Sequence, residues 1–201
     1  MLLDIFITFL LVFLNGFFVA AEFAIVKVRA SQLEVKVKEG NRIAILSKHI
    51  VTNLDGYLAA TQLGITLASL GLGWIGEPVV SKIIIKIMAL VGFASNPELA
   101  HQIALPIAFA FITILHIVFG ELAPKSLAIQ RSEQTTTFIT YPLQFFFIVF
   151  RPFIWTLNSI ANFILKSIGI SPVHGADIHS SEELKYRVKQ GQASGEIDAA
   201  E

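Results

Sequence analysis

The sequence contains no cysteine, only two methionines, and few charged residues for its length. Without cysteine there are no disulfides, no thiolate catalysis, and no zinc or iron–sulfur centre held by sulfur. Charged residues make up 15% of the chain, whereas a soluble domain carries about 25%. The side chains left to bind a metal ion are mainly oxygen donors and five histidines. We therefore expect any bound metal ion to be held chiefly by oxygen.

Apolar residues are abundant, and the charges that are present cancel. Hydrophobic residues make up 54% of the 201 positions, and the mean hydropathy is +0.69. The 15 basic and 15 acidic residues give no formal net charge, so charge favours no nucleic-acid partner. The composition predicts an all-α integral membrane protein, surrounded by the lipid bilayer and crossing the plasma (inner) membrane several times.

The first apolar run predicts a membrane-spanning helix from Leu2 to about Ala24. No Lys or Arg precedes this run and Asp4 lies within it, so we do not interpret it as a signal peptide. Asn15 and Glu22 are nearly two helical turns apart and share one face. Asn15 either lines a binding site or forms a hydrogen bond between helices, and Glu22 either joins it or marks the membrane border.

A basic loop, residues 27–52, follows the first apolar run. Its basic residues are Lys27, Arg29, Lys36, Lys38, Arg42 and Lys48. Positive charge this close to a spanning helix predicts the cytoplasmic side, which places the N-terminus outside. We expect short amphipathic helices in the loop, with a turn at Gly40-Asn41. Binding of anionic lipid is an alternative use of the charges.

The second spanning helix is predicted from Asp55 to about Ile75, with two distinct faces. One face carries polar and small groups at helical spacing: Gln62, Thr66, Ser69 and Gly73. The other carries only small residues, which allow close helix contacts: Ala60, Gly64, Ala68 and Gly71. Trp74, Glu77 and Pro78 indicate the outer end of this helix, and a separate surface helix is expected from Ser81 to Val91.

The third spanning helix, Ile103 to Ala123, ends in an unusual group of residues. His116, Gly120 and Pro124 are each four residues apart and share a face of a regular helix. Pro124 has no N–H, so the Gly120 carbonyl lacks its usual partner. A free carbonyl beside the carboxylate of Glu121 is an oxygen pair suited to a hard cation. The alternative is that Glu121 pairs with Lys125 at the membrane border.

The sequence also predicts where the third helix begins and how the membrane part of the chain is divided. Asn96 is expected to cap the third helix, with Pro97 at its first position. Residues 1–137 form a three-helix transmembrane core. In residues 138–170, Tyr141-Pro142 and Arg151-Pro152 are expected to break the apolar run into interfacial juxtamembrane helices. A four-span topology is the alternative.

Residues 171–201 are expected to form an acidic cytosolic linker. Ser180 and Glu183 match a capping box that opens a helix, which Gly191 would end. The sequence reaches Glu201 within this acidic element, so a soluble domain is expected to follow it.

Four stretches resemble the transmembrane domain of the CorC/CNNM family. They are LNGFFVAAEFAIVKVR (Leu14–Arg29), TQLGITLASLGLGWIGEP (Thr61–Pro78), HIVFGELAPKSLA (His116–Ala128) and the tail SEELKYRVKQGQASGEID. The resemblance implies a homodimer that exports Mg²⁺ in exchange for Na⁺. It also implies a C-terminal pair of CBS domains, absent from this sequence, that binds ATP and regulates transport.

The resemblance further implies a cation site between the three helices, formed by Ser69 with Thr61 or Thr66, and by Gly120 with Glu121. The chain departs from the family in having Val19, Ala20 and Ala21 where relatives often carry a serine before the glutamate. The complete predicted metal-binding set is Asn15, Glu22, Thr61, Thr66, Ser69, Gly120 and Glu121, with Glu22 and Glu121 forming an acidic entrance.

Two classes of function remain open from the sequence. The first is a secondary-active Mg²⁺ transporter, with export and coupling to Na⁺. The alternative is a non-transporting membrane scaffold or Mg²⁺ sensor that acts through its cytosolic domains. We do not expect an enzyme, because the sequence indicates no nucleophile–base pair and no clear serine partner for His116.

Overall fold

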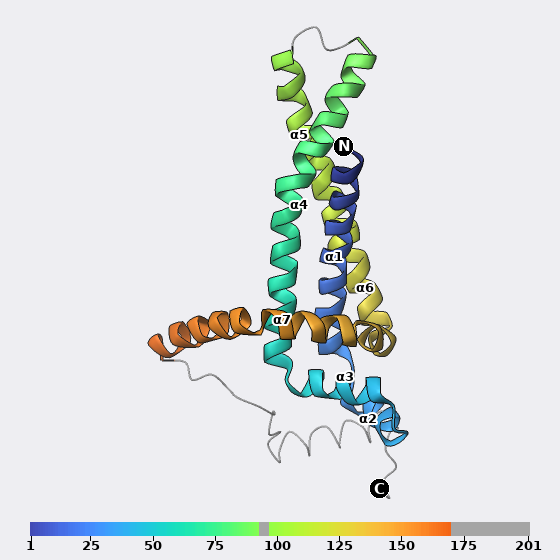
Figure 1. Ribbon diagram of the computed structural model, residues 1–201, viewed down its shortest axis with the longest axis vertical. Coiled ribbons are helices and arrows are strands. Elements are labelled where there is room, and N and C mark those ends of the chain that lie inside the picture. The colour runs from blue at the N-terminus through green and yellow to red at the C-terminus, as the bar shows by residue number, and fades with distance from the viewer. Residues whose placement is uncertain (93–96, 170–201) are drawn as a thin grey trace, which may run out of the picture. The chain divides into compact units, whose positions relative to one another are not determined.

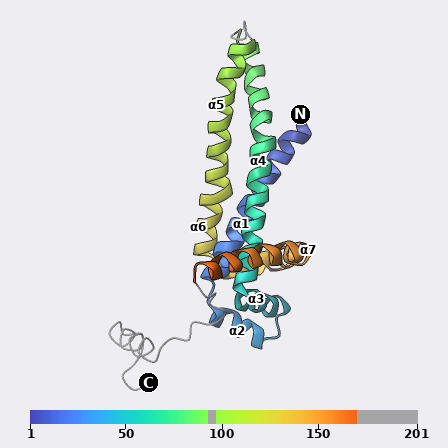
Figure 2. The same cartoon turned by 90° about the vertical axis from the view of Figure 1, so that its left-hand side faces the viewer.

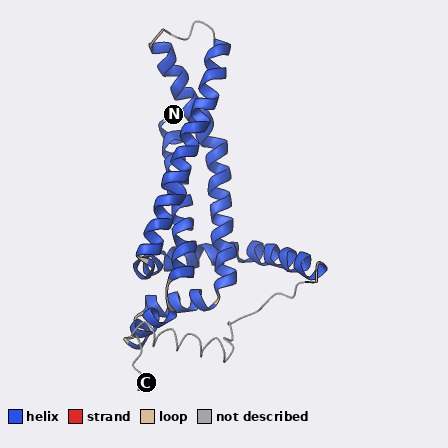
Figure 3. Ribbon diagram, turned by 180° about the vertical axis from the view of Figure 1, so that it is seen from behind, coloured by secondary structure: helices blue, strands red, loops and turns tan. Residues whose placement is uncertain are grey.

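The computed structural model describes residues 1–92 and 97–169, in which all the regular elements are helices (Figure 3). They are α1 (Leu2–Lys27), α2 (Ala30–Lys38), α3 (Arg42–Thr52), α4 (Leu54–Leu90), α5 (Pro97–Leu115), the π-helix η1 (His116–Leu122), α6 (Ala123–Gln130) and α7 (Ser132–Ser167). The predicted all-α fold is confirmed. Asn96 and the tail 171–201, including its capping box, lie outside the described residues.

Internal contacts divide the chain into two units, Met1–Ile160 and Ala161–Glu201. The described part of the second unit holds only the end of α7 and Gly169, whose φ of 80° suits a residue without Cβ. All helix packing described below belongs to the first unit.

Three long helical segments lie side by side in the first unit (Figures 1 and 2). α1 contacts both α4 and the continuous α5–η1–α6 segment, and α4 contacts α5. The three correspond to the three apolar runs of the sequence, with Pro97 opening α5 as predicted, and Pro106 lies inside that helix. α4 and α5 extend beyond the N-terminus of α1 in both views.

α4 is longer than the sequence indicates. The prediction that it ends near Ile75, followed by a separate helix at Ser81–Val91, is wrong, because α4 continues through Pro78 to Leu90. The proline removes one backbone hydrogen bond, and packed neighbours can compensate for that loss in a membrane helix. Val79 and Ser81, directly beyond the proline, are buried, so α4 keeps its packing partners there.

Small residues on α4 set the contact with α1. Ala60, Gly64 and Ala68 are all buried, as the predicted stripe requires. A Cβ added to Gly64 would lie 2.5 Å from the ring of Phe18 on α1. That ring is held in turn by Phe146 of α7, with ring centroids 4.6 Å apart. The two helices can therefore approach this closely only because position 64 is glycine.

α7 is one helix, so the prediction that two prolines divide it is wrong. Pro142 and Pro152 both lie inside α7 on its exposed face, and the helix continues past each of them. Within residues 1–92 and 97–169, four helical segments could cross a membrane by length and composition, α7 among them, and not the three counted from the sequence. Up to Ile160, α7 runs crosswise to α1 and α4 near their lower ends (Figures 1 and 2).

Side chains of α7 fasten it to α3 and α4. Tyr57 of α4 stacks on Phe147, with ring centroids 4.4 Å apart, and its hydroxyl donates to Gln144. The hydroxyls of Ser47 and Thr140 lie 2.6 Å apart and are buried. These contacts connect the basic loop to α7, and the loop itself folds as the two predicted short helices.

The turn between α2 and α3 is also as predicted. Gly40 has a φ of 79°, and Asn41 caps α3 by accepting hydrogen bonds from the backbone N–H groups of Ile43 and Ala44. Lys36 of α2 forms an ion pair with Glu133 at the start of α7. At least one charge of the basic loop therefore has a partner within the protein.

Replacing Gly64 by alanine should weaken the contact between α1 and α4. The new methyl group would collide with Phe18, and overpacking of this kind costs about 1–3 kcal/mol. The expected result is a lower midpoint of thermal unfolding in detergent. Gly73→Ala on the same helix is the matched control, because nothing lies within 4 Å of its added Cβ. Equal midpoints for the two variants would contradict the close contact.

Candidate cation site

The π-helix η1 changes the backbone pattern at the end of the third apolar run. The N–H of Ala123 donates to the carbonyl of Val118, five residues earlier. Pro124 has no N–H to give to Gly120, four residues earlier, or to Phe119, five residues earlier. One proline thus withholds a donor from two successive carbonyls. The prediction that residues 116, 120 and 124 continue a regular α-helical face is wrong, because η1 interrupts the repeat.

Asn15 and Gly16 of α1 meet these two carbonyls. The side-chain Nδ2 of Asn15 donates to the Gly120 carbonyl at 3.0 Å, and Asn15 is only 1% exposed. A Cβ added to Gly16 would lie 2.9 Å from the Phe119 oxygen and 2.9 Å from the Pro124 ring. Gly16 therefore lets α1 come close enough for Asn15 to reach Gly120. The sequence analysis did not single out Gly16, although it directly follows the polar Asn15.

Ser69 and His116 extend the contact between Asn15 and Gly120 into a ring of three hydrogen bonds, which the backbone of η1 closes. The Ser69 hydroxyl donates to Asn15 Oδ1 at 2.9 Å, and its oxygen lies 3.2 Å from His116 Nε2. A hydroxyl has one hydrogen, so the histidine is the donor in the second contact. Gly120 belongs to the same π-helix as His116, which closes the ring. We call these four residues (Asn15, Ser69, His116 and Gly120) the polar ring.

The polar ring corrects one expectation about His116. The sequence indicated no clear serine partner for this histidine, whereas the structure pairs it with Ser69. The partner comes from another helix, so local spacing could not reveal it. In this pairing the serine accepts a hydrogen from the histidine and donates its own to an amide. A serine nucleophile requires the opposite arrangement, in which histidine accepts the serine proton.

The other predicted ligands lie apart from the polar ring. Glu22 accepts a hydrogen bond from Gln62 Nε2 at 2.9 Å. Thr61 is buried and donates to the Leu58 carbonyl, and Thr66 is exposed and donates to the Gln62 carbonyl. Both threonine hydroxyls are used within α4 itself.

Glu121 is exposed, and no ion pair joins it to Lys125 in the parts of the chain that the structure describes. The Lys125 ammonium lies 4.5 Å from the centre of the Phe23 ring instead. Of the seven predicted ligands, the structure therefore brings together Asn15, Ser69 and Gly120. His116 and Gly16 are the additions that the sequence analysis did not include.

The oxygen atoms of the polar ring suit a cation that passes through. Gly120 supplies a carbonyl, Asn15 an amide oxygen and Ser69 a hydroxyl, all hard neutral donors. Asn15 Nδ2 now donates to Gly120, so a cation must displace this N–H and turn the amide oxygen toward the carbonyl. Across residues 1–92 and 97–169 no three His, Asp or Glu residues cluster around a common point. Three neutral oxygens favour weak, exchangeable binding over a permanent metal centre.

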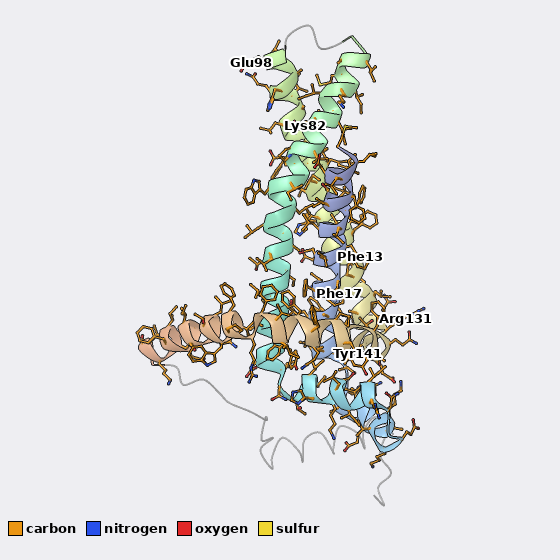
Figure 4. The ribbon with its side chains drawn as sticks, viewed as in Figure 1. Phe13, Phe17, Lys82, Glu98, Arg131 and Tyr141 are labelled. Carbon is orange, nitrogen blue, oxygen red and sulfur yellow. The ribbon has the colours of Figure 1, made fainter. Side chains whose placement is uncertain are left out.

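An apolar groove lies against the face of α1 that is opposite to Asn15. This groove of 530 Å³ runs between α1, η1, α6 and the start of α7. Figure 4 shows two of its residues, Phe13 and Phe17, along α1, and Arg131 below them. Its lining is mainly apolar, so it offers little to a dehydrated ion.

In the described residues four helical segments are of membrane-spanning length, and three of them meet at the buried polar ring, which defines this chain as a multi-pass membrane protein with a polar site inside its helix bundle. Residues 6–201 match the family described as "Cyclin M transmembrane N-terminal domain". The chain belongs to this CNNM family.

Relatives in bacteria support the assignment. The chain is 43% identical over 192 residues to the UPF0053 protein YhdT of Bacillus subtilis, covering 95% of this chain and 41% of YhdT. It is 44% identical over 193 residues to the UPF0053 protein YrkA of the same organism, covering 96% and 44% of the two chains. It is 34% identical over 193 residues to the uncharacterized protein MT1889 of Mycobacterium tuberculosis, covering 96% and 54%. The chain thus spans about half or less of each of these relatives.

Removing the Asn15 side chain should destabilise the bundle. In Asn15→Ala the buried Gly120 carbonyl loses its partner, at a cost of about 1–3 kcal/mol. Thr66→Ala is the control: its hydroxyl is exposed and bonds only to its own helix, so the change should stay within about 0.5 kcal/mol. Denaturation in mixed micelles measures both. If Asn15→Ala were as stable as Thr66→Ala, the polar ring would not contribute to stability.

Proposed function

We propose that this domain carries Mg²⁺ across the membrane through the polar ring. The observation that supports the proposal most directly is the convergence of Asn15, Ser69 and the Gly120 carbonyl inside an otherwise apolar bundle. Irregular backbone at membrane depth is tolerated where it is buried in protein or lines a water-filled path. π-Helices also occur frequently at functional sites.

The choice of ion follows from the donor chemistry. The polar ring offers oxygen and one imidazole, and the chain has no sulfur ligand except two methionines, which disfavours softer metals. Mg²⁺ prefers six oxygens and loses its water reluctantly. Three oxygens from the ring leave three coordination positions for water, so the ion loses only part of its hydration shell. Partial dehydration of this kind suits a transport site better than a permanent binding site.

The acidic side chains suggest where the ion enters. Glu22 lies seven residues after Asn15 on α1, about 10 Å along the helix, toward the predicted cytoplasmic end. With Glu121, it supplies negative charge on that side of the polar ring. Entry from the cytoplasm corresponds to export, with the N-terminus outside and the C-terminus inside. Coupling to Na⁺, a homodimer, and regulation by ATP through C-terminal CBS domains remain predictions that rest on the family resemblance.

A second candidate function is that of a Mg²⁺ sensor or membrane scaffold without transport. The observation that favours it is the closure of the polar ring, since each of its three side chains already has a hydrogen-bond partner within the ring. In that case the hydrogen bonds hold the helices together, and cytosolic domains perform the function. Purified chain in liposomes, tested for Mg²⁺ flux with an internal fluorescent indicator, separates the two functions.

Mg²⁺ binding should depend on Ser69 and not on Thr66. Ser69→Ala removes one oxygen of the polar ring, and the loss of about 1.4 kcal/mol weakens binding tenfold. Glu121→Gln should weaken it too, because it removes negative charge near the entrance. Thr66→Ala should bind as the wild type does. Isothermal titration calorimetry with MgCl₂ measures all four proteins, and unchanged binding in both Ser69→Ala and Glu121→Gln would reject the site.

We further propose three membrane spans, formed by α1, α4 and α5–η1–α6, with α7 lying along the cytoplasmic interface. The support is the crosswise course of α7 up to Ile160 and the Arg151 charge within it.

The native chain has no cysteine, so single cysteines can report topology. Ser132→Cys and Lys166→Cys mark the two ends of α7. Both should react with an impermeant maleimide from the same face of sealed vesicles, because a helix that lies on the membrane has both ends on one side. Reaction from opposite faces would establish α7 as a fourth span.

A further inference from the structure

A small cavity lies beside the polar ring, between α4 and the α5–η1 segment. It has a volume of 170 Å³, and its polar lining residues are Ser69, Glu77, Thr113 and His116, while Leu72, Gly73, Phe109 and Ile112 complete the lining. Glu77 lies eight residues after Ser69, about 12 Å along α4. The cavity therefore extends from the ring toward the N-terminus of α1. The contact of Gly76 with Thr8, where an added Cβ would meet the Thr8 methyl at 3.2 Å, fixes this direction.

Glu77 is the charged group of this cavity. It is half-buried and lies inside a helix that is long and apolar enough to cross a membrane. No ion pair or hydrogen bond joins it to any other residue that the structure describes. Acidic residues in spanning helices are costly and usually face a water-filled path or a binding partner. The Glu77 carboxylate thus has a cavity beside it and no partner among the described residues.

The polar ring and the cavity share two residues. Ser69 donates to Asn15 on the side of the ring and accepts from His116, and both Ser69 and His116 line the cavity. These two residues, joined by a contact of 3.2 Å, are therefore common to the polar ring and the cavity.

We infer that this cavity is a second binding site for a divalent cation, on the far side of the polar ring from Glu22. The Glu77 carboxylate and the Thr113 hydroxyl hold the ion there together with part of its water. A water molecule occupies about 30 Å³ in the liquid, so the cavity has room for several. The inference rests on the proposed cation transport and adds the site that the ion reaches after it leaves the ring.

A cysteine placed in the cavity tests the inference, and the cysteine-free chain provides the background. Gly73→Cys adds a thiol where nothing lies within 4 Å of the Cβ. Leu70→Cys, one turn away, is the control, because Leu70 is exposed as Gly73 is but does not line the cavity. The full chain in sealed vesicles is treated with a cationic, membrane-impermeant methanethiosulfonate from each face in turn.

The expected result has three parts. Gly73→Cys reacts several times faster than Leu70→Cys from the face on which the N-terminus lies, because only the cavity admits water. MgCl₂ slows the reaction of Gly73→Cys. Adding Glu77→Gln to Gly73→Cys preserves the labelling and removes the protection by Mg²⁺, since the amide has no charge to hold the ion.

Two results would overturn the inference. Equal rates for Gly73→Cys and Leu70→Cys would mean that the cavity does not admit water, and equal protection by Mg²⁺ with and without Glu77→Gln would mean that Glu77 does not bind the ion. Phe109→Cys, in the α5 part of the cavity lining, repeats the comparison if the first variant does not fold. The labelling measures ion binding in the cavity, and calorimetry with Ser69→Ala measures ion binding at the polar ring. A failure of the cavity site is therefore distinguished from a failure of the transport proposal.

Discussion

The missing amide hydrogen of Pro124 is the constraint on which the centre of the bundle depends. Inside a membrane, a carbonyl without a donor must find one within the protein. Because η1 is a π-helix, the same proline withholds a donor from both Phe119 and Gly120. Asn15 donates the missing hydrogen bond to the Gly120 carbonyl. Gly16 has no side chain, so α1 can lie close enough to η1 for Asn15 to reach this carbonyl.

The polar ring lies between two different groups of residues along the bundle. On one side of the polar ring lie Glu22 and Gln62, joined by a hydrogen bond. On the other side lies the cavity of Glu77. Ser69 contacts both sides, since it donates toward Asn15 and accepts from His116. Ser69 is therefore the residue of α4 that belongs both to the polar ring and to the lining of the cavity.

The parts of the fold set by local chemistry could be predicted from the sequence. The three apolar runs, the turn at Gly40-Asn41 and the loss of a donor at Gly120 follow from periodicity and covalent structure alone. The continuation of α4 past Pro78 could not be predicted, because neighbouring helices compensate for the lost hydrogen bond. α7 likewise continues past both of its prolines. These outcomes depend on tertiary contacts, on which the sequence pattern carries no direct information.

The residues of the polar ring could likewise be predicted from the sequence only in part. Asn15 and Ser69 were identifiable because polar side chains are rare in these helices. Thr66 has the same signature as Ser69 in the sequence, yet its hydroxyl bonds to its own helix, and only the position of the neighbouring helices distinguishes the two. His116 was visible as a residue but not as a partner of Ser69, because its contact crosses between helices and the π-helix alters its direction.

The closure of the polar ring also has a consequence for the permeability of the membrane to small ions. In the closed arrangement the Asn15 amide hydrogen occupies the side of the Gly120 carbonyl that a stray ion would need. Under the proposed transport function, an ion would have to displace this hydrogen bond before it could reach the carbonyl. The closed arrangement would then prevent leakage of ions between transport events.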